Sequence, residues 1–112
     1  MDRVEHYRDI VRQVLTDYQQ LNEKSESATE SALVFDETHD HYLIVLMGWN
    51  DDERIKSNMI HVRLKDGKIW IEEDWTETGV ATDLLENGIS KDAIVLAFHP
   101  PQVRRYTEFA AA

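Results

Sequence analysis

Two histidines separated by one residue lie in the densest group of potential metal ligands in the sequence. His39 and His41 stand among three carboxylates, Asp36, Glu37 and Asp40. A His-x-His pair on a β-strand directs both imidazoles to one face, an arrangement that a zinc or iron site can use. The same residues also suit a hairpin turn, where charged side chains collect because water solvates them. A small metal-dependent hydrolase is therefore one hypothesis, and a solvated turn is the other.

A second acidic group lies near two tryptophans, Trp70 and Trp75. Its members are Glu72, Glu73, Asp74 and Glu77. Glycosidases need two carboxylates across a cleft, one of them with a raised pKa. However, Asp74 and Glu77 have the spacing of a helix capping box, and Glu72 and Glu73, as strand neighbours, are expected to point to opposite faces. The glycines form neither a phosphate-binding loop nor a nucleophile elbow. We therefore predict no catalytic residue, no cofactor and no enzymatic activity.

Basic and aromatic residues occur together near the C-terminus. Arg, Tyr and Trp are enriched at binding hot spots, so this cluster could anchor a protein partner. Alternatively, the arginines pair with the protein's own acidic surface, such as the carboxylates after Trp70. The candidate partner interface consists of Trp70, Trp75, His99, Arg104, Arg105 and Tyr106.

The charge balance bears on the kind of partner. Lys and Arg number 12 and Asp and Glu number 22, which gives a net charge of −10. Such a surface repels phosphate, and duplex binding depends on several Lys or Arg contacts. We therefore expect no direct nucleic-acid binding. The acidic charge fits either a partner with a basic surface or simply a soluble protein. If the charge is strongly segregated, direct DNA binding is the alternative, through Arg63, Lys65, Arg104 and Arg105.

The length of 112 residues fits one domain, residues 1–112, with one modest core. No apolar run approaches the roughly 20 residues that a membrane span needs, and the charged N-terminus resembles neither a signal nor a transit peptide. The sequence has no cysteine, which fits a reducing compartment. We expect a cytoplasmic protein with no membrane association.

The first half of the chain is predicted to form a long helix followed by strands. Over residues 2–22, apolar residues recur at three- and four-residue steps, which predicts an amphipathic helix. Residues 22–31 are polar and predict a loop. Strands are predicted over 33–35, 42–49 and 54–65, and Asp66-Gly67 predicts a tight hairpin turn into a fourth strand from Lys68.

The second half is predicted to be less regular. A shorter helix is expected after Asp74, with Val80 and Leu84 on its apolar side, ending at Asn87-Gly88. Residues 94–98 predict a short fifth strand or a buried turn, and residues 102–109 a last helical turn or two after Pro101. The predicted fold is α+β: an N-terminal helix packed on a four-stranded antiparallel meander, then a shorter helix and an irregular C-terminal segment.

The strand over residues 42–49 is apolar on both faces. A sheet covered on one side only should alternate between apolar and polar residues, so the second face of this strand needs a cover. The C-terminal segment could supply it, or a second subunit could. Because two-fold dimers are the commonest way to bury such a patch, we predict a homodimer.

Several of these stretches also carry a family resemblance. The chain closely resembles the XisI-like proteins, the fdxN element excision controlling factor family, and the likeness runs in the same order through nearly the whole sequence. Ser90 departs from the proline that the family commonly has after Gly-Ile, but Ser can still cap a helical turn. The matching stretches are 36–38 with Tyr42, 48–49, 66–71, Asp74 with 76–77, 88–89 through Lys91, 94–96 with Phe98, Pro101, and 105–110.

The resemblance implies a small bacterial α+β protein involved in the controlled excision of a DNA element by a site-specific recombinase. It also implies a companion protein, XisH, which resembles nucleases. The family offers no agreed catalytic residue. The function expected from the resemblance is that of a non-enzymatic regulatory protein that binds a nuclease-like or recombinase partner.

Overall fold

The chain opens with one long helix, α1 (Arg3–Lys24). The computed structural model describes residues 3–25 and 29–112. The predicted helix matches α1 except at its ends; Asp2 and part of the predicted loop, residues 26–28, lie outside the described residues. Its buried side is centred on Val11, Val14 and Leu15. Leu21, at the end of the apolar stripe, is 65% exposed, so the stripe is longer than the surface it covers.

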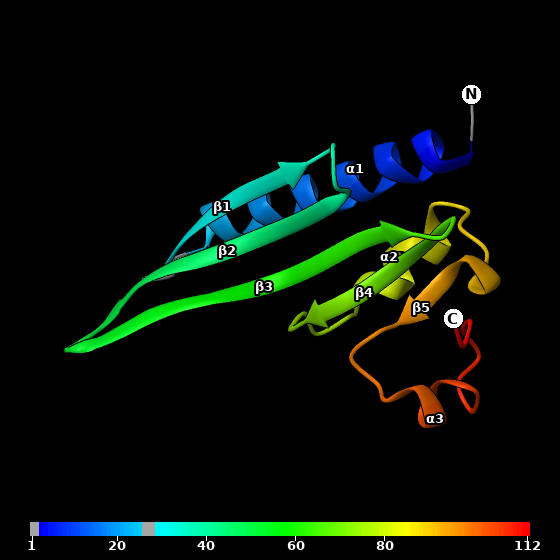
Figure 1. Cartoon of the computed structure of the whole chain (residues 1–112). Helices are drawn as coiled ribbons and strands as arrows, with labels where there is room; N and C mark the ends of the chain where they lie inside the picture. The colour runs from blue at the N-terminus through cyan, green and yellow to red at the C-terminus, as the bar shows by residue number, and fades with distance from the viewer. Residues whose placement is uncertain (1–2, 26–28) are drawn as a thin grey trace.

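Five strands follow and form one sheet in chain order (Figure 1). They are β1 (Thr29–Asp36), β2 (His41–Asn50), β3 (Glu53–Lys65), β4 (Lys68–Asp74) and β5 (Ile94–Leu96). The first four are antiparallel neighbours, as the sequence predicts, and β5 pairs parallel to β4. The α+β prediction is confirmed, with one strand more than the four-stranded meander. β1 begins within the stretch predicted as loop.

Two backbone features fix the register of the sheet. In the β3–β4 turn, Asp66 and Gly67 both have positive φ, 52° and 75°, as a two-residue type I′ turn requires. The pairing of β3 with β4 shifts by one residue, so that Val62 faces Ile71 while His61 faces Glu73. Such a β-bulge leaves one residue of β4, Glu72, without a direct partner.

The passage from β4 into α2 (Val80–Glu86) depends on Asp74. Its carboxylate accepts hydrogen bonds from the Thr76 N–H at 2.9 Å, the Thr76 hydroxyl at 2.6 Å and the Val80 N–H at 2.7 Å. The predicted capping box with Glu77 is wrong, because α2 starts six residues after Asp74 and the capped N–H belongs to Val80. The chain then passes through a 3-10 turn (η1, Lys91–Ala93) to β5 and α3 (Pro101–Arg104). At the start of this turn, the Ser90 hydroxyl accepts a hydrogen bond from the Asp92 N–H.

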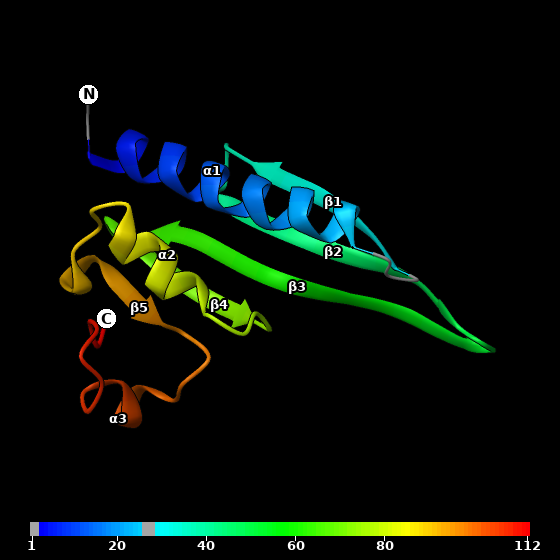
Figure 2. The same cartoon turned by 180° about the vertical axis from the view of Figure 1, so that it is seen from behind.

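The core lies between the sheet and the two longer helices, which both cover the same face (Figure 2). Tyr42 and Ile44 of β2, Ile60 and Val62 of β3, and Ile69 and Ile71 of β4 are fully buried on this side. We call the opposite side the outer face. The C-terminal segment, residues 97–112, contacts β4 and β5 and forms a parallel bridge between Ala110 and Val95. No described helix is long and apolar enough to cross a membrane.

The β2–β3 hairpin projects past the end of α1, as Figures 1 and 2 show. The radius of gyration is 14.6 Å, compared with about 13 Å for a compact chain of this length. The outer face of β2 is not covered by the C-terminal segment, which lies at the β4–β5 edge of the sheet in both views. The C-terminal segment therefore does not supply the cover predicted for this strand.

Candidate functional site

The C-terminal segment is held against the outer face of β4 by Arg104. Its guanidinium donates hydrogen bonds to the carbonyl oxygens of His99 at 2.9 Å and Ala97 at 3.1 Å. The same group lies 5.5 Å from the centroid of the Trp70 ring. Arg104 therefore closes the loop between β5 and α3 and covers an aromatic ring at once.

The Trp70 ring lies under Arg104 on the outer face of β4 and supports the C-terminal segment there. It is only 8% exposed, its indole N–H donates to the Lys65 carbonyl at 3.0 Å, and the Lys65 ammonium lies 4.9 Å from its ring centroid. Three predicted residues, Trp70, Arg104 and His99, are thus brought together. They form the base of a surface, and Trp70 itself is not accessible to a partner.

The accessible part of this region is an apolar and cationic patch. Tyr106 is 76% exposed, and the Arg105 guanidinium lies 4.9 Å from its ring centroid and donates to its hydroxyl at 3.0 Å. Phe98 and Val103 are also exposed in the same segment. We call these four residues, Phe98, Val103, Arg105 and Tyr106, the C-terminal surface. Sequence reasoning missed Phe98 and Val103, although the apolar residues around His99-Pro100-Pro101 were a signal for them.

Trp75, the remaining residue of the predicted interface, follows the end of β4. It is 75% exposed, and its indole N–H donates to Glu73 at 2.7 Å. Its backbone N–H binds the Met59 carbonyl, which ties the residue to β3. β4 and β5 run parallel, so Trp75 and Phe98 both leave the sheet at the carboxyl ends of their strands.

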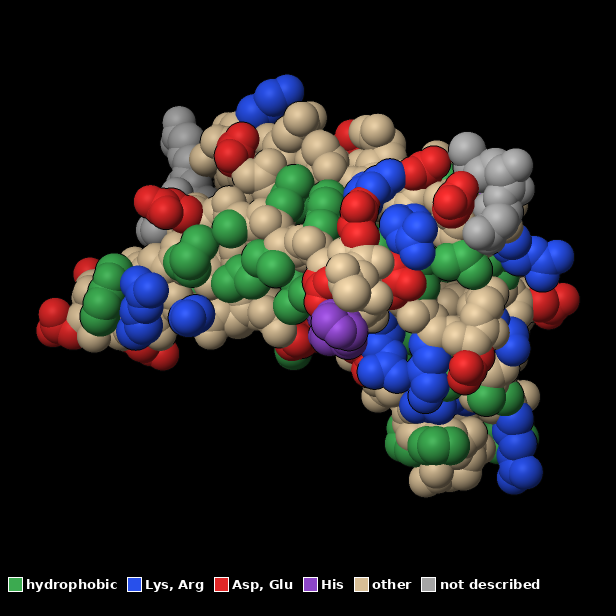
Figure 3. Space-filling view, turned by 45° about the horizontal axis from the view of Figure 1, so that its top comes forward, with side chains coloured by type: hydrophobic (Ala, Val, Ile, Leu, Met, Phe, Trp, Pro, Cys, Tyr) green, Lys and Arg blue, Asp and Glu red, His purple; other side chains and the backbone are tan. Residues whose placement is uncertain are grey.

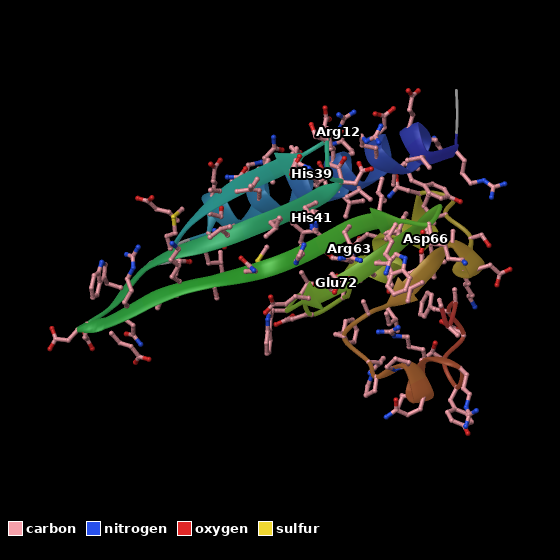
Figure 4. All side chains as sticks on the ribbon, in the orientation of Figure 1. Arg12, His39, His41, Arg63, Asp66 and Glu72 are labelled. Carbon is pink, nitrogen blue, oxygen red and sulfur yellow. The ribbon has the colours of Figure 1, made fainter. Side chains whose placement is uncertain are left out.

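His39 and His41 have different partners (Figure 4). His39 lies in the β1–β2 turn, where its Nδ1 is 2.9 Å from an Asp36 carboxylate oxygen. His41 lies on β2 with its Nδ1 3.0 Å from Nε2 of His61. Within residues 3–25 and 29–112, no three His, Cys, Asp or Glu side chains are grouped so that they could hold a metal ion.

The His41–His61 pair has acidic and basic neighbours on the outer face. Burial, and then the charge of His41, lower the pKa of His61 below its ordinary value. Arg63, which pairs directly with His41, lies 3.4 Å from Glu72. The bulge turns both Glu72 and Glu73 toward this face, so the expectation that they point to opposite faces is wrong.

The residues of the alternative DNA-binding set are partly clustered. Arg63, Lys65 and Arg104 all lie around Trp70: Arg63 pairs with it across the strands, and the other two cover its ring. Arg63 and Arg104 are already engaged, with Glu72 and with backbone carbonyls. Arg105 lies with Tyr106 in the C-terminal surface. Arg63, Lys65 and Arg104 thus each have a contact within the protein, whereas Arg105 is exposed.

A long helix and a short one on one side of a five-stranded sheet, with a buttressed C-terminal segment on the other, define a small α+β protein. The model of the XisI protein family matches residues 1–111, and the chain belongs to this family. No curated protein matches the sequence.

Two solved structures share the fold over their whole length. One is the crystal structure of the fdxN element excision controlling factor XisI from Anabaena variabilis ATCC 29413, with 34% sequence identity and a TM-score of 0.88. The other is a XisI-like protein from the same organism, with 32% identity and a TM-score of 0.89. Each match covers 99% of this chain and 100% of the other chain.

Proposed function

We propose that the protein is a non-enzymatic regulator of DNA-element excision that acts in the cytoplasm by binding a protein partner. The observation that carries the proposal is the match, over 99% of the chain, to a protein known as an excision controlling factor. The partner is a nuclease-fold companion resembling XisH or the site-specific recombinase itself. Neither direct DNA contact nor a cofactor is part of this proposal.

The C-terminal surface supports binding to a protein. Tyr and Arg are enriched at hot spots, and exposed aromatic side chains provide contact area at low entropic cost. Arg104 and Trp70 support this patch from below and keep it ordered before a partner arrives, which reduces the entropic cost of binding. Tyr106 is the expected anchor because it is the most exposed aromatic residue of the patch.

The net charge of −10 supports a partner that is basic around its contact with the C-terminal surface, since the acidic residues lie outside the local positive charge of Arg105. A nuclease or recombinase must carry a cationic face to hold DNA. An acidic protein associates with such a face quickly and in a salt-dependent way. By occupying it, the protein would control access of the enzyme to the element.

The test is co-purification of the tagged protein with an XisH-like companion or the recombinase, at low and high salt. Tyr106→Ala is expected to weaken the complex about tenfold or more. Gln102→Ala is the matched control, since Gln102 is exposed on the neighbouring α3. Loss of complex in the Tyr106 variant and not in the control supports the proposal. The proposal fails if no complex forms with either partner at micromolar concentration, or if the purified protein binds duplex DNA on its own.

A further inference from the structure

The outer face of β1 and β2 carries a stripe of apolar side chains that no other part of the described chain covers. Trp49 is 56% exposed and Val34 is 45% exposed, and Leu43, Val45 and Met47 are half-buried between them. None of the five belongs to the core or packs against it. Figure 3 shows hydrophobic side chains along the projecting hairpin on this side of the sheet, with Lys and Arg beside them.

The register aligns the outer-face side chains of β1, β2 and β3 in rows that cross the sheet. Residues that face each other directly in antiparallel strands share a face, so each row runs from β1 through β2 to β3. The two outermost rows are Glu30–Met47–Lys56 and Asp36–His41–Arg63. The two rows between them are Ala32–Val45–Asn58 and Val34–Leu43–His61. The β1 edge is therefore acidic at both ends and the β3 side is basic at both ends, while β2 between them carries the apolar residues Leu43, Val45 and Met47 and ends in His41.

From this pattern we infer that the outer face binds a second copy of the same chain through a two-fold axis running along β2. Rotation by 180° about this axis places β2 of one copy on β2 of the other, and β1 of each copy over β3 of its partner. Leu43, Val45 and Met47 then meet their own equivalents. Glu30 of each copy lies over Lys56 of the other. Asp36, which also contacts His39, lies over Arg63, which also contacts Glu72.

Charge complementarity is what selects a second copy as the occupant. An isologous interface must be complementary to itself, and a face that is acidic on one side of an apolar stripe and basic on the other meets this condition. Sheets that pack face to face lie about 10 Å apart with strand directions within about 30°. That spacing lets Glu and Lys side chains of opposite rows reach each other.

The position of the C-terminal segment is compatible with this arrangement. The segment lies at β4 and β5, two strands away from the axis on the β3 side. In the dimer, the partner's segment lies beyond the β1 edge of the first copy. Both C-terminal surfaces remain open, so self-association and partner binding use different parts of the molecule.

The experiment is sedimentation equilibrium of the full chain with charge-reversal variants. The wild-type chain is expected to sediment as a dimer at low micromolar concentration. Glu30→Lys and Lys56→Glu each place like charges at both symmetric contacts, and each is expected to weaken the dimer about tenfold or more. The double variant Glu30→Lys/Lys56→Glu is expected to restore it. Glu86→Lys, an exposed reversal on α2, is the matched control and is expected to leave it unchanged.

Mixing the two single variants gives the sharpest result. The lysine introduced in the Glu30→Lys chain then meets the glutamate introduced in the Lys56→Glu chain, and the unchanged Lys56 of the first chain meets the unchanged Glu30 of the second. A heterodimer is therefore expected to form at concentrations at which each variant alone is monomeric.

An apolar-to-charged variant tests the middle of the interface. Met47→Glu, checked for folding by circular dichroism, is expected to remain monomeric. The inference is overturned if the wild-type chain sediments near 13.1 kDa, or if the dimer persists in Met47→Glu. It is also overturned if the double variant is no tighter than the singles.

Discussion

Asp74 controls the change from strand to helix through three hydrogen bonds to one carboxylate. Asp74→Ala removes both acceptor oxygens, and with them the three hydrogen bonds, and leaves the Val80 N–H without its cap. We expect the free energy of unfolding to fall by about 1–2 kcal/mol, measured by urea denaturation. Glu77→Ala is the control, because Glu77 is exposed and was the residue expected from the capping box; its effect should stay within about 0.5 kcal/mol. Equal losses in the two variants would contradict this account.

Tyr42, Arg8 and Asp40 form a hydrogen-bonded group that joins β2 to α1. The Tyr42 hydroxyl donates to Asp40 at 2.8 Å and accepts from Arg8 at 3.0 Å, and Arg8 also donates to Asp40 at 3.0 Å. Burial raises the pKa of Asp40, but the hydrogen bonds from Arg8 and Tyr42 outweigh it, so its pKa lies below the ordinary value. Its carboxylate therefore stabilises the fold above its unfolded pKa, and this stability is lost as the pH falls through the folded pKa.

Tyr42→Phe tests this group. We expect a loss of about 1–3 kcal/mol at neutral pH, because the hydroxyl is removed from two partly buried charged partners. The control is Tyr7→Phe, since Tyr7 is a half-buried tyrosine on α1. Its free energy of unfolding is expected to change by less than about 0.5 kcal/mol. Urea denaturation measures both.

The same variant has a predicted alkaline signature. Burial, with the hydrogen bond to Asp40, raises the pKa of Tyr42 to about 12, above the unfolded value of about 10. The folded state therefore retains a proton that the unfolded state loses, and the resulting stability is fully present below about pH 10. As the pH rises toward 12, the stability difference between the wild type and Tyr42→Phe should shrink. A constant difference would show that Tyr42 ionises as an ordinary tyrosine.

At the scale of elements, the sequence predicted what local pattern determines. The Asp66-Gly67 turn needs positive φ at both positions, which Gly and Asp tolerate. These two residues were therefore enough to predict the β3–β4 hairpin. The bulge at Glu72 could not be predicted from the sequence, because a register shift depends on what both strands pack against. Nor could the parallel pairing of β5 be fixed, since three apolar residues suit a strand and a buried turn equally well.

The candidate partner interface could likewise be predicted only in part from the sequence. The sequence offered Arg105, Tyr106 and Trp75 as interface residues, and in the structure all three are exposed. The sequence could not show that Trp70, unlike these three, is buried. Its burial depends on Arg104, which lies 34 positions further along the chain. Arg104 reaches Trp70 because β5 pairs with β4.

Arg104 is expected to hold the C-terminal segment as one unit. In Arg104→Ala the carbonyls of Ala97 and His99 lose their donor and Trp70 loses its cover. Amide hydrogens of residues 97–110 should exchange on the order of tenfold faster, while those of β2 and β3 stay unchanged, and Trp70 emission should shift to the red. Arg105→Ala, on the exposed side of the same turn, is the control. Equal acceleration throughout the sheet would mean that Arg104 contributes to global stability instead.

At the scale of the whole molecule, the charge of −10 opposes folding because compaction brings like charges together. Ion pairs such as Arg8–Asp40 and Arg12–Glu37 act in the opposite direction, and salt screens both effects. With 22 acidic residues and 12 basic ones, the carboxylates outnumber the cationic groups by ten, so repulsion should dominate. Raising the NaCl concentration from about 0.02 M to about 0.5 M at neutral pH should increase the free energy of unfolding by about 0.5–1 kcal/mol.

The control for this last prediction is the same titration near the isoelectric point of 4.8. The net charge is close to zero there, so little repulsion remains to be screened, and the added salt should have no stabilising effect. Urea denaturation at the lowest usable protein concentration keeps self-association from contributing. If salt lowers the stability at neutral pH, attraction within the ion pairs exceeds the net repulsion, and the acidic surface is organised in local pairs rather than as one repelling field.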